Sequence, residues 1–335
     1  MKKLKIAQIA PIWYPLPPKK YAGIERIAYC LTEGLVRKGH KVTLFASGDS
    51  KTSAKLLSSR KKALVKDRVS WSDTFWELEN ISFSFSKAKN FDIIHSHIGL
   101  RTLFFQELVE TPVVHTFHNP VYSESKKLPS HLRILENHKE TTNACFISRS
   151  AKKLCPVKIK KDWVVYNGID LGLFKFSPKP EEYFVWVGRV DPYKGIENAI
   201  RAAKIAKVKL FLAGKLDEER KKYFKKKIKP LLSKKIVFLG EVTQKKLVRL
   251  YGKAKALLYP IEWNEPFGLV MAEAQACGTP VITFKFGSTP EVVKDHKTGF
   301  VVPFLDKKGK KNLKGIVKAI KSIDDMKRQD CRNWV

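Results

Sequence analysis

The sequence predicts an α/β protein with two domains, each a doubly wound parallel sheet. Strand and helix patterns alternate up to residue 170, give way to a segment that contains Pro178 and Pro180, and begin again at Tyr183. At 335 residues the chain is long for one hydrophobic core and sufficient for two. We therefore expect an N-terminal domain at 1–170, a linker at 171–182 and a C-terminal domain at 183–335.

The N-terminal domain begins with a βαβ pattern. A strand at 5–10 is followed by a proline-rich loop, a helix from Gly23 to Gly39, and a second strand at 42–46. Further short buried strands follow, up to the one that begins at Trp163. Residues 49–90 are harder to interpret, because a basic run precedes Trp71, Phe75 and Trp76. Such a pattern can dock on an anionic membrane, but aromatic residues at helical spacing more often belong to a core, and we prefer the core interpretation.

The C-terminal domain repeats the alternation. Strands are expected at 183–187, 208–213, 236–242, 256–259 and 281–284, and helices at 196–206, 217–235, after Thr243, and from Leu269 to Gly278. The helix at 217–235 is rich in lysine, which indicates a solvated surface.

Two acidic residues bracket the start of the helix at Leu269. Glu265 precedes it, Glu273 lies eight residues further on, and Pro266 and Gly268 stand in the turn between loop and helix. The free N–H groups at a helix start and the positive end of its dipole form a binding site for anions. The alternative is an ordinary amphipathic helix with a surface acid.

Two basic residues follow the strand at 183–187 within a glycine frame, in the run Gly188-Arg189-Val190-Asp191-Pro192-Tyr193-Lys194-Gly195. A guanidinium group binds phosphate oxygens through two parallel hydrogen bonds, and a lysine adds a point charge. Together these side chains can stabilise negative charge on a departing diphosphate. The alternative is a surface loop with two solvated cations.

Four histidines stand at the ends of two expected strands of the N-terminal domain: His95 and His97 after one, His115 and His118 after the other. Ligands bind at the carboxyl edge of a parallel sheet, so a metal site deserves consideration. No cysteine or carboxylate cluster accompanies the histidines, and we do not expect a metal.

The composition is strongly basic, with 65 Lys and Arg against 32 Asp and Glu and a net charge of +33. The excess is mostly lysine and is dispersed, which favours a solvated surface over a site that recognises bases. The field still favours nucleotides, phosphates and anionic membranes. Five scattered cysteines without metal-type spacing indicate free thiols, and the basic N-terminus leads into a strand rather than a signal peptide, so we expect a cytoplasmic protein.

Several of these motifs together resemble glycosyltransferase family 4, the retaining, nucleotide-sugar-dependent enzymes of GT-B architecture. The resemblance rests on E-P-F-G-L-V-M-A-E-A-Q-A-C-G-T-P-V-I with its E-x7-E signature, on G-R-x-x-x-x-K-G, on D-I-I-H-x-H and H-T-x-H, and on N-G-I-D. It implies two Rossmann-like domains that face a central cleft, with the donor held by the second domain and the acceptor by the first.

The resemblance also implies roles for individual residues. Arg189 and Lys194 would clamp the donor diphosphate, Glu265 would orient the sugar, Glu273 would bind the ribose, and His118 would stand at the sugar and acceptor. By these roles, the resemblance implies four catalytic residues: His118, Arg189, Lys194 and Glu265. The remaining residues implied at the nucleotide sugar are Gly23, Gly188, Gly240, Glu241, Val242, Pro266, Phe267, Gly268 and Leu269.

The function implied is transfer of a hexosyl unit from a nucleoside diphosphate sugar, UDP- or GDP-linked, to a hydroxyl of a saccharide or lipid-linked acceptor, with retention. No cofactor or metal is expected, because two cations take the role of Mg²⁺ and no D-x-D triplet is present. The alternatives are a non-hydrolysing nucleotide-sugar epimerase and a nucleic-acid or polyanion-binding protein without enzymatic activity. Family members usually carry a long C-terminal helix that returns to the first domain, and we expect this chain to lack it.

Overall fold

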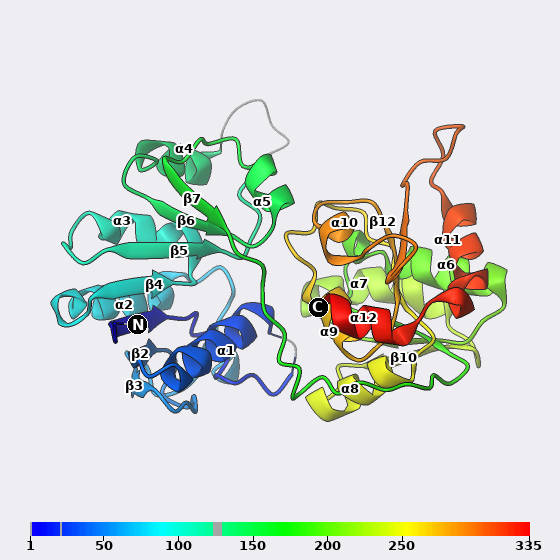
Figure 1. Ribbon diagram of the computed structural model, residues 1–335, viewed down its shortest axis with the longest axis horizontal. Helices are drawn as coiled ribbons and strands as arrows, with labels where there is room; N and C mark the ends of the chain where they lie inside the picture. The colour runs from blue at the N-terminus through cyan, green and yellow to red at the C-terminus, as the bar shows by residue number, and fades with distance from the viewer. Residues whose placement is uncertain (1, 21, 123–128) are drawn as a thin grey trace. The chain divides into compact units, whose positions relative to one another are not determined.

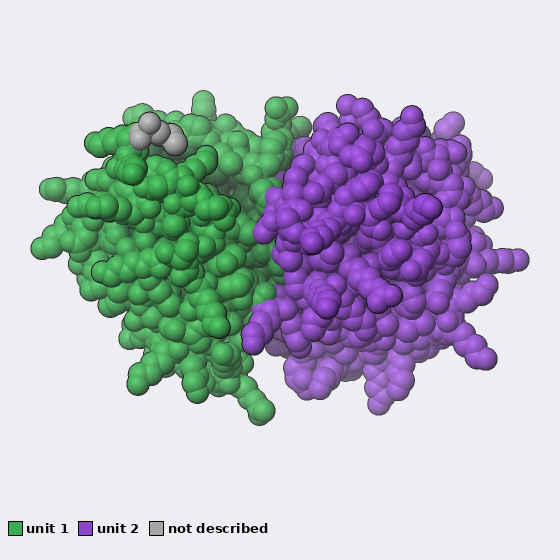
Figure 2. Space-filling view, turned by 60° about the horizontal axis from the view of Figure 1, so that its bottom comes forward, with its two compact units in different colours: residues 1–18, 22–168 green, residues 19–21, 169–335 purple. Residues whose placement is uncertain are grey.

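The chain divides into two compact units (Figure 2). The computed structural model describes residues 2–20, 22–122 and 129–335. Unit 1 comprises residues 1–18 and 22–168, and unit 2 comprises residues 19–21 and 169–335. The division thus falls after Gly168, whereas the sequence pattern placed the end of the first domain at residue 170.

Unit 1 is a parallel sheet of seven strands in the order β3-β2-β1-β4-β5-β6-β7, with helices on both faces (Figure 1). The strands are β1 (Lys5–Ile9), β2 (Lys41–Phe45), β3 (Lys55–Leu57), β4 (Ile93–Ser96), β5 (Val113–Phe117), β6 (Asn143–Phe146) and β7 (Lys161–Val164). The helices are α1 (Gly23–Arg37), α2 (Phe75–Phe85), α3 (Leu103–Gln106), α4 (Ser130–Asn137) and α5 (Arg149–Leu154), with 3-10 turns η1 (Leu64–Lys66), η2 (Ala88–Asn90) and η3 (Gly99–Thr102).

The alternation of side chains along β2 explains why helices cover both faces of this sheet. Leu44 is buried in a cluster with Ala28 of α1, and the next residue, Phe45, is buried in a different cluster with Ile81 of α2. Successive side chains of a strand point to opposite faces, so α1 and α2 lie on opposite sides of β2.

Unit 2 is a parallel sheet of six strands in the order β10-β9-β8-β11-β12-β13. The strands are β8 (Phe184–Val187), β9 (Leu210–Ala213), β10 (Ile236–Gly240), β11 (Leu257–Tyr259), β12 (Val281–Phe284) and β13 (Gly299–Val302). The helices are α6 (Ile196–Ala206), α7 (Lys221–Tyr223), α8 (Gln244–Lys253), α9 (Leu269–Ala276), α10 (Thr289–Val292), α11 (Leu313–Lys321) and α12 (Arg328–Trp334). The predicted α/β fold class is therefore confirmed, with one doubly wound parallel sheet in each unit.

Both sheets reverse their strand order at an equivalent point. In unit 1 the reversal lies between β1 and β4, and in unit 2 between β8 and β11. Connections leave such a point toward opposite faces, which opens a crevice outside the carboxyl ends of the two strands, where ligands of α/β proteins bind. The sites described below lie at the carboxyl ends of the strands at these two points of reversal.

The predicted helix at 217–235 is present but shorter and irregular. The chain is helical from Glu218 to Leu231, through η5 (Glu218–Arg220), α7, a π-helical turn η6 (Phe224–Ile228) and η7 (Lys229–Leu231). Pro230 lacks the N–H that a regular α-helix uses, and the ring of Phe224 in the wider π turn packs on Phe238, with centroids 4.7 Å apart.

The core interpretation of the aromatic residues after the basic run is also wrong for two of the three. Trp71 is 50% and Phe75 80% exposed, although Trp71 stacks on Trp13 at 4.1 Å. Trp76 is half-buried and lies under the guanidinium of Arg60 at 4.2 Å.

The last helix, α12, belongs to unit 2. Arg328 donates to the carbonyls of Ser177, Gly252 and Ala254, and Arg332 donates to those of Leu171, Phe174 and Ala276. The helix thereby caps the carbonyl ends of α8 and α9 and holds the segment that follows unit 1. Among the described residues, no helix has the length and apolar composition to cross a membrane.

Candidate active site

A lysine and a glutamate form the centre of the site in unit 2. The ammonium of Lys194, in the 3-10 turn η4 (Pro192–Lys194), donates to Glu265 Oε2 at 2.6 Å and lies 4.3 Å from the ring centroid of Trp263. Both charged side chains are nearly buried, with exposures of 11% for Lys194 and 9% for Glu265. A pair so shielded from water interacts far more strongly than a surface ion pair.

Two further donors hold the Glu265 carboxylate. Tyr259, the last residue of β11, donates its hydroxyl to Oε2 at 2.9 Å, and the indole Nε1 of Trp263 donates to the same oxygen at 3.0 Å. Within the described part of the chain, the hydrogen bonds of this carboxylate all go to Oε2. Oε1 is thus the oxygen that can accept from a ligand.

Glycines bring the loops that carry this pair together. Gly195 has φ of +70°, and a Cβ there would lie 2.0 Å from the carbonyl oxygen of Pro260. Gly287 has φ of +51°, and a Cβ there would lie 2.4 Å from the carbonyl oxygen of Glu265. Only glycine permits both the left-handed backbone and this close approach, so these residues fix the loops around Glu265.

The helix α9 starts directly beyond this centre. Gly268, with φ of +81°, is its N-cap, and the N–H groups of the first turn, from Leu269 onward, point away from the helix body. Pro266 and Phe267 form the turn that leads into the helix, and the Phe267 carbonyl accepts from the Ser288 hydroxyl at 2.9 Å. The arrangement provides an anion site next to the Lys194 ammonium.

Glu273 lies within α9 and is 5% exposed. Its Oε2 accepts from the hydroxyl of Tyr251, on α8, at 3.2 Å. Burial, followed by the charge of Glu273, raises the pKa of the Cys277 thiol to about 12, so that cysteine is a neutral packing residue.

Arg189 is accessible where Lys194 is not. It follows Gly188 at the end of β8, its side chain is 52% exposed, and its Nε lies 4.0 Å from Asp217. Asp217 is more closely paired with Lys215, at 2.7 Å. Arg189 thus offers its guanidinium to an incoming anion at small cost in existing interactions.

The loops after β8, β9 and β10 are packed backbone to backbone. A Cβ at Gly214 would lie 1.7 Å from the Gly188 carbonyl oxygen, and the N–H of Gly214 donates to the Gly240 carbonyl at 2.8 Å. Glu241 and Val242 continue from Gly240 along the same edge of the sheet. The structure therefore gathers the sequence-predicted residues of the C-terminal domain at one edge.

The other two predicted residues lie in unit 1. Gly23 begins α1. His118 follows β5, and its Nε2 lies 2.8 Å from Nδ1 of His97, which follows β4. Within the described residues, no group of three or more His, Cys, Asp or Glu side chains is arranged to hold a metal ion.

The residues that position these groups lie outside the sequence motifs. Tyr259, Trp263, Tyr251 and Gln8 contact predicted site residues or their neighbours but belong to no motif named above. Tyr259 and Gln8 do stand on strands that flank the two points of reversal, which is a signal that the predicted topology could have supplied.

Comparison with known families covers most of the chain. Residues 21–173 match the family model "Glycosyltransferase Family 4", and residues 174–309 match the model "Glycosyl transferases group 1". An uncharacterized glycosyltransferase of Methanocaldococcus jannaschii is 27% identical over 88% of this chain and 85% of its own length. The D-inositol 3-phosphate glycosyltransferase of Mycobacteroides abscessus is 27% identical over 64% of this chain and 55% of its own length.

Solved structures share the fold. Sucrose-phosphate synthase from Thermosynechococcus elongatus has a TM-score of 0.77 at 22% identity, over 99% of this chain and 92% of that chain. Anabaena HepE in complex with UDP and glucose has a TM-score of 0.71 at 19% identity, over 99% of this chain and 93% of that chain.

Fold and family models together define a glycosyltransferase of GT-B architecture. The chain belongs to glycosyltransferase family 4.

Proposed function

We propose that the protein transfers a hexosyl unit from a nucleoside diphosphate sugar to an acceptor hydroxyl with retention at the anomeric carbon. The observation that carries the proposal is the buried contact of Lys194 with Glu265 beside the start of α9, at the point of strand reversal in unit 2. The site combines a cation, helix N–H groups and a carboxylate in one place. Those are the groups needed to hold a diphosphate and the hydroxyls of a sugar.

The cations act on the leaving group. Arg189 and Lys194 neutralise the diphosphate as the bond between the anomeric carbon and the phosphate oxygen breaks, and the N–H groups of Phe267, Gly268 and Leu269 add to this. The Lys194 ammonium has three N–H donors, so it can keep its bond to Glu265 while it donates to phosphate. No metal is required in this scheme, since positive charge is already present.

The carboxylates orient the donor. Glu265 accepts from the sugar hydroxyls through Oε1, and Glu273 accepts from the ribose. The segment Gly240-Glu241-Val242 contacts the nucleobase. A UDP-sugar is the first donor to test, because HepE was solved with UDP-glucose.

His118 acts at the sugar and the acceptor, and Gly23 binds the donor phosphates. The acceptor is a saccharide or a lipid-linked molecule that presents a hydroxyl. That hydroxyl forms the new bond to the anomeric carbon as the diphosphate leaves, and its proton passes to the leaving group or to solvent.

The donor site can be tested by thermal unfolding with UDP, GDP, ADP and TDP in the absence of metal. A ligand that binds only the folded state raises the melting temperature, and we expect the rise for one nucleotide and its loss in Arg189→Ala and Glu273→Gln. Arg201→Ala is the control, because Arg201 is exposed and pairs with Glu197 on the same helix. An equal rise with all four nucleotides and with pyrophosphate, retained by the variants, would leave only nonspecific attraction of phosphate to a basic protein.

Transfer must be measured separately, because a nucleotide-sugar epimerase would also bind the nucleotide. Incubation with UDP-glucose and an acceptor should release UDP and form a glycoside with the anomeric configuration of the donor. Release of the epimeric UDP-sugar alone would favour the epimerase.

We further propose that the protein works in the cytoplasm, at the inner face of the cell membrane. The exposed rings of Trp71 and Phe75 lie close in sequence to the exposed cations Lys61, Lys62 and Arg68. Apolar rings beside cations suit an anionic membrane surface. The protein should sediment with phosphatidylserine vesicles at physiological salt, Trp71→Ser with Phe75→Ser should release it, and the exposed residue Ile205 of unit 2, changed to serine, should not.

A further inference from the structure

A chain of hydrogen bonds runs from the first strand of unit 1 to His118. Gln8 lies in β1 and is fully buried, His97 follows β4 and is 2% exposed, and His118 follows β5 and is half-buried. The Gln8 Oε1 lies 2.9 Å from His97 Nε2, and His97 Nδ1 lies 2.8 Å from His118 Nε2. The chain therefore leads from a buried amide through one ring to a second ring at the edge of the sheet.

The direction of each bond follows from the chemistry of the partners. An amide oxygen can only accept, so His97 donates through Nε2. A neutral imidazole carries one N–H, so Nδ1 of His97 accepts, and His118 must donate to it through Nε2. Nδ1 of His118 is then an acceptor.

The amide nitrogen of Gln8 also has a partner, the ring of His95. Its Nε2 lies 3.4 Å from His95 Nδ1, and His95 Nε2 lies 2.7 Å from the Thr116 hydroxyl oxygen. An amide nitrogen can only donate, so His95 accepts at Nδ1 and donates to Thr116. With the oxygen of Gln8 toward His97, both polar atoms of the amide therefore have a partner of the required kind.

All three rings are neutral at physiological pH. Desolvation lowers the pKa of His95 to about 4 and that of His118 to about 3, and it lowers the pKa of His97 well below its usual value. The tautomers are thus set by hydrogen bonding rather than by protonation.

We propose that Gln8 and His97 are positioning residues that hold His118 in the tautomer with Nδ1 unprotonated, so that His118 accepts a hydrogen bond from a hydroxyl group of the substrate. This rests on the proposed function for the assignment of His118 to the sugar and acceptor. The chemical class selected is a hydroxyl, because a phosphate or carboxylate oxygen has no proton to give to a neutral acceptor nitrogen. The reversed amide would make Nδ1 of His118 a donor and favour an anion.

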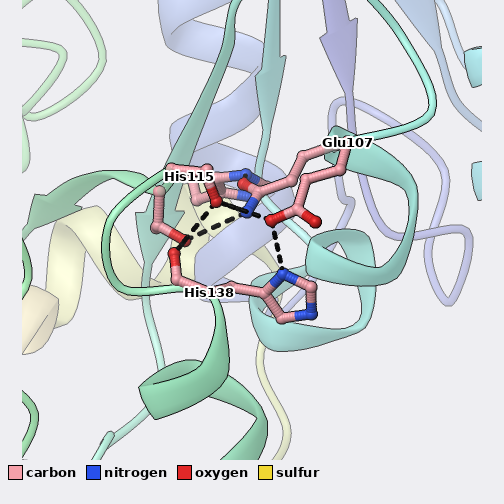
Figure 3. A network of polar contacts seen from close by, with 6 residues as sticks. Glu107, His115 and His138 are labelled. Atoms are coloured by element: carbon pink, nitrogen blue, oxygen red, sulfur yellow. Dashed lines mark hydrogen bonds and ion pairs between the residues drawn. The ribbon is translucent and has the colours of Figure 1, made fainter.

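A second glutamine and histidine in the same unit provide the matched control. The Oε1 of Gln106, in α3, lies 2.8 Å from His115 Nε2, and its Nε2 donates to Thr141 and Thr142. Figure 3 shows this network, which continues through Thr141 to Glu107 and His138. Among the described residues, the hydrogen bonds of His118 lead to His97 and not to this network. It contains the same buried contact between an amide oxygen and an imidazole without the connection to the candidate site.

The first test is independent of activity. Long-range proton–nitrogen correlation spectra of the full chain with nitrogen-15 in its histidines distinguish protonated from unprotonated ring nitrogens, and His118→Asn assigns the resonances. We expect Nε2 of His118 to be protonated and Nδ1 unprotonated at pH 7.5. The opposite tautomer would overturn the proposal, whatever the enzyme turns out to transfer.

The second test compares Gln8→Met with Gln106→Met. Gln8→Met should mix the two His118 tautomers and lower kcat about tenfold, the effect of one lost hydrogen bond in the transition state, with the melting-temperature rise by the nucleotide unchanged. Gln106→Met should leave the His118 spectrum and kcat as they are. Equal losses of kcat in the two variants, with an unchanged His118 spectrum, would overturn the positioning role. Absence of any nucleotide effect in the unmodified protein would instead count against the proposed function.

Discussion

The two units place opposite kinds of chemistry at the same topological position. At the reversal in unit 2, Lys194 and Glu265 form a nearly buried ion pair beside the start of α9. At the reversal in unit 1, Gln8 and His97 form a neutral chain that ends at His118. One edge is built around charges and suits a diphosphate, while the other is built around neutral donors and acceptors and suits hydroxyls. A common fold thus leaves the character of each site to a few side chains.

Breaking the ion pair should have the largest effect on activity and stability. Lys194→Met leaves the Glu265 carboxylate buried without its cation, and we expect a loss of about 3–5 kcal/mol in the free energy of unfolding and of about 100-fold or more in kcat. Urea unfolding and initial rates measure the two effects. The double variant with Glu265→Gln should recover much of the stability and none of the activity. The exposed pair Lys221 and Glu218, changed to Met and Gln, should shift stability by less than about 0.5 kcal/mol.

Acidification should lower the stability of unit 1 more than that of unit 2. His95 and His118 have pKa values of about 4 and 3 in the folded state, and His115, also buried, has one of about 3. The unfolded chain therefore binds more protons below its histidine pKa of about 6.5, and the stability contributed by these rings is complete above that pH and is lost as the pH falls toward 4 and 3. We expect a loss of several kcal/mol between pH 7 and pH 4.5.

One carboxyl opposes this trend. Burial raises the pKa of Glu25, at the start of α1, to about 7, so its contribution to stability is present at low pH and is lost as the pH rises through 7. Glu25→Gln should therefore make the loss of stability on acidification steeper. Hydrogen exchange at pH 7 and pH 5, read separately for the two units, checks both statements, and equal loss of protection in the units would contradict the comparison.

Separating the two loops that meet at Gly195 should have a moderate effect on stability and on nucleotide binding. Gly195→Ala introduces a Cβ against the Pro260 carbonyl at φ of +70°, and we expect a loss of about 2–3 kcal/mol and weaker nucleotide binding as Lys194 moves from Glu265. Gly309→Ala is the control, because Gly309 has φ of +69° and open space around the Cβ position. It should cost only about 1 kcal/mol in backbone strain. Equal effects would mean that strain alone, and not the approach of the loops, matters at Gly195.

The smallest expected effect concerns Glu273. Tyr251→Phe removes the hydroxyl that donates to its carboxylate, and we expect a loss of about 1 kcal/mol in stability with a small change in nucleotide affinity. Thermal unfolding with and without the nucleotide measures both.

The sequence predicted the elements well where hydrophobic runs meet glycine or a cap. The helix at 196–206 has the bounds that the pattern gave it, and α9 is closed by Gly278 with φ of +84°. The site residues of unit 2 were predicted from motifs, and their roles remain predictions. At 217–235 the predicted helix is present from Glu218 to Leu231 but irregular, because a packing contact of Phe224 and a proline interrupt the regular α-helical hydrogen bonds that the lysine-rich pattern predicts.

The contacts inside the sites could not be predicted from sequence patterns. Lys194 and Glu265 are 71 positions apart, and Gln8 and His97 are 89 positions apart. Each pair meets because two loops or two strands are brought together by the whole sheet. Local spacing records only neighbours within one element, so these contacts required the structure.

The two arginines of α12 have a mechanical consequence. Since they fasten Leu171, Phe174 and Ser177 to the ends of α8 and α9, the connecting segment is held as part of unit 2 from Leu171 onward. Loss of α12 would therefore release a segment that lies more than 150 positions earlier in the sequence.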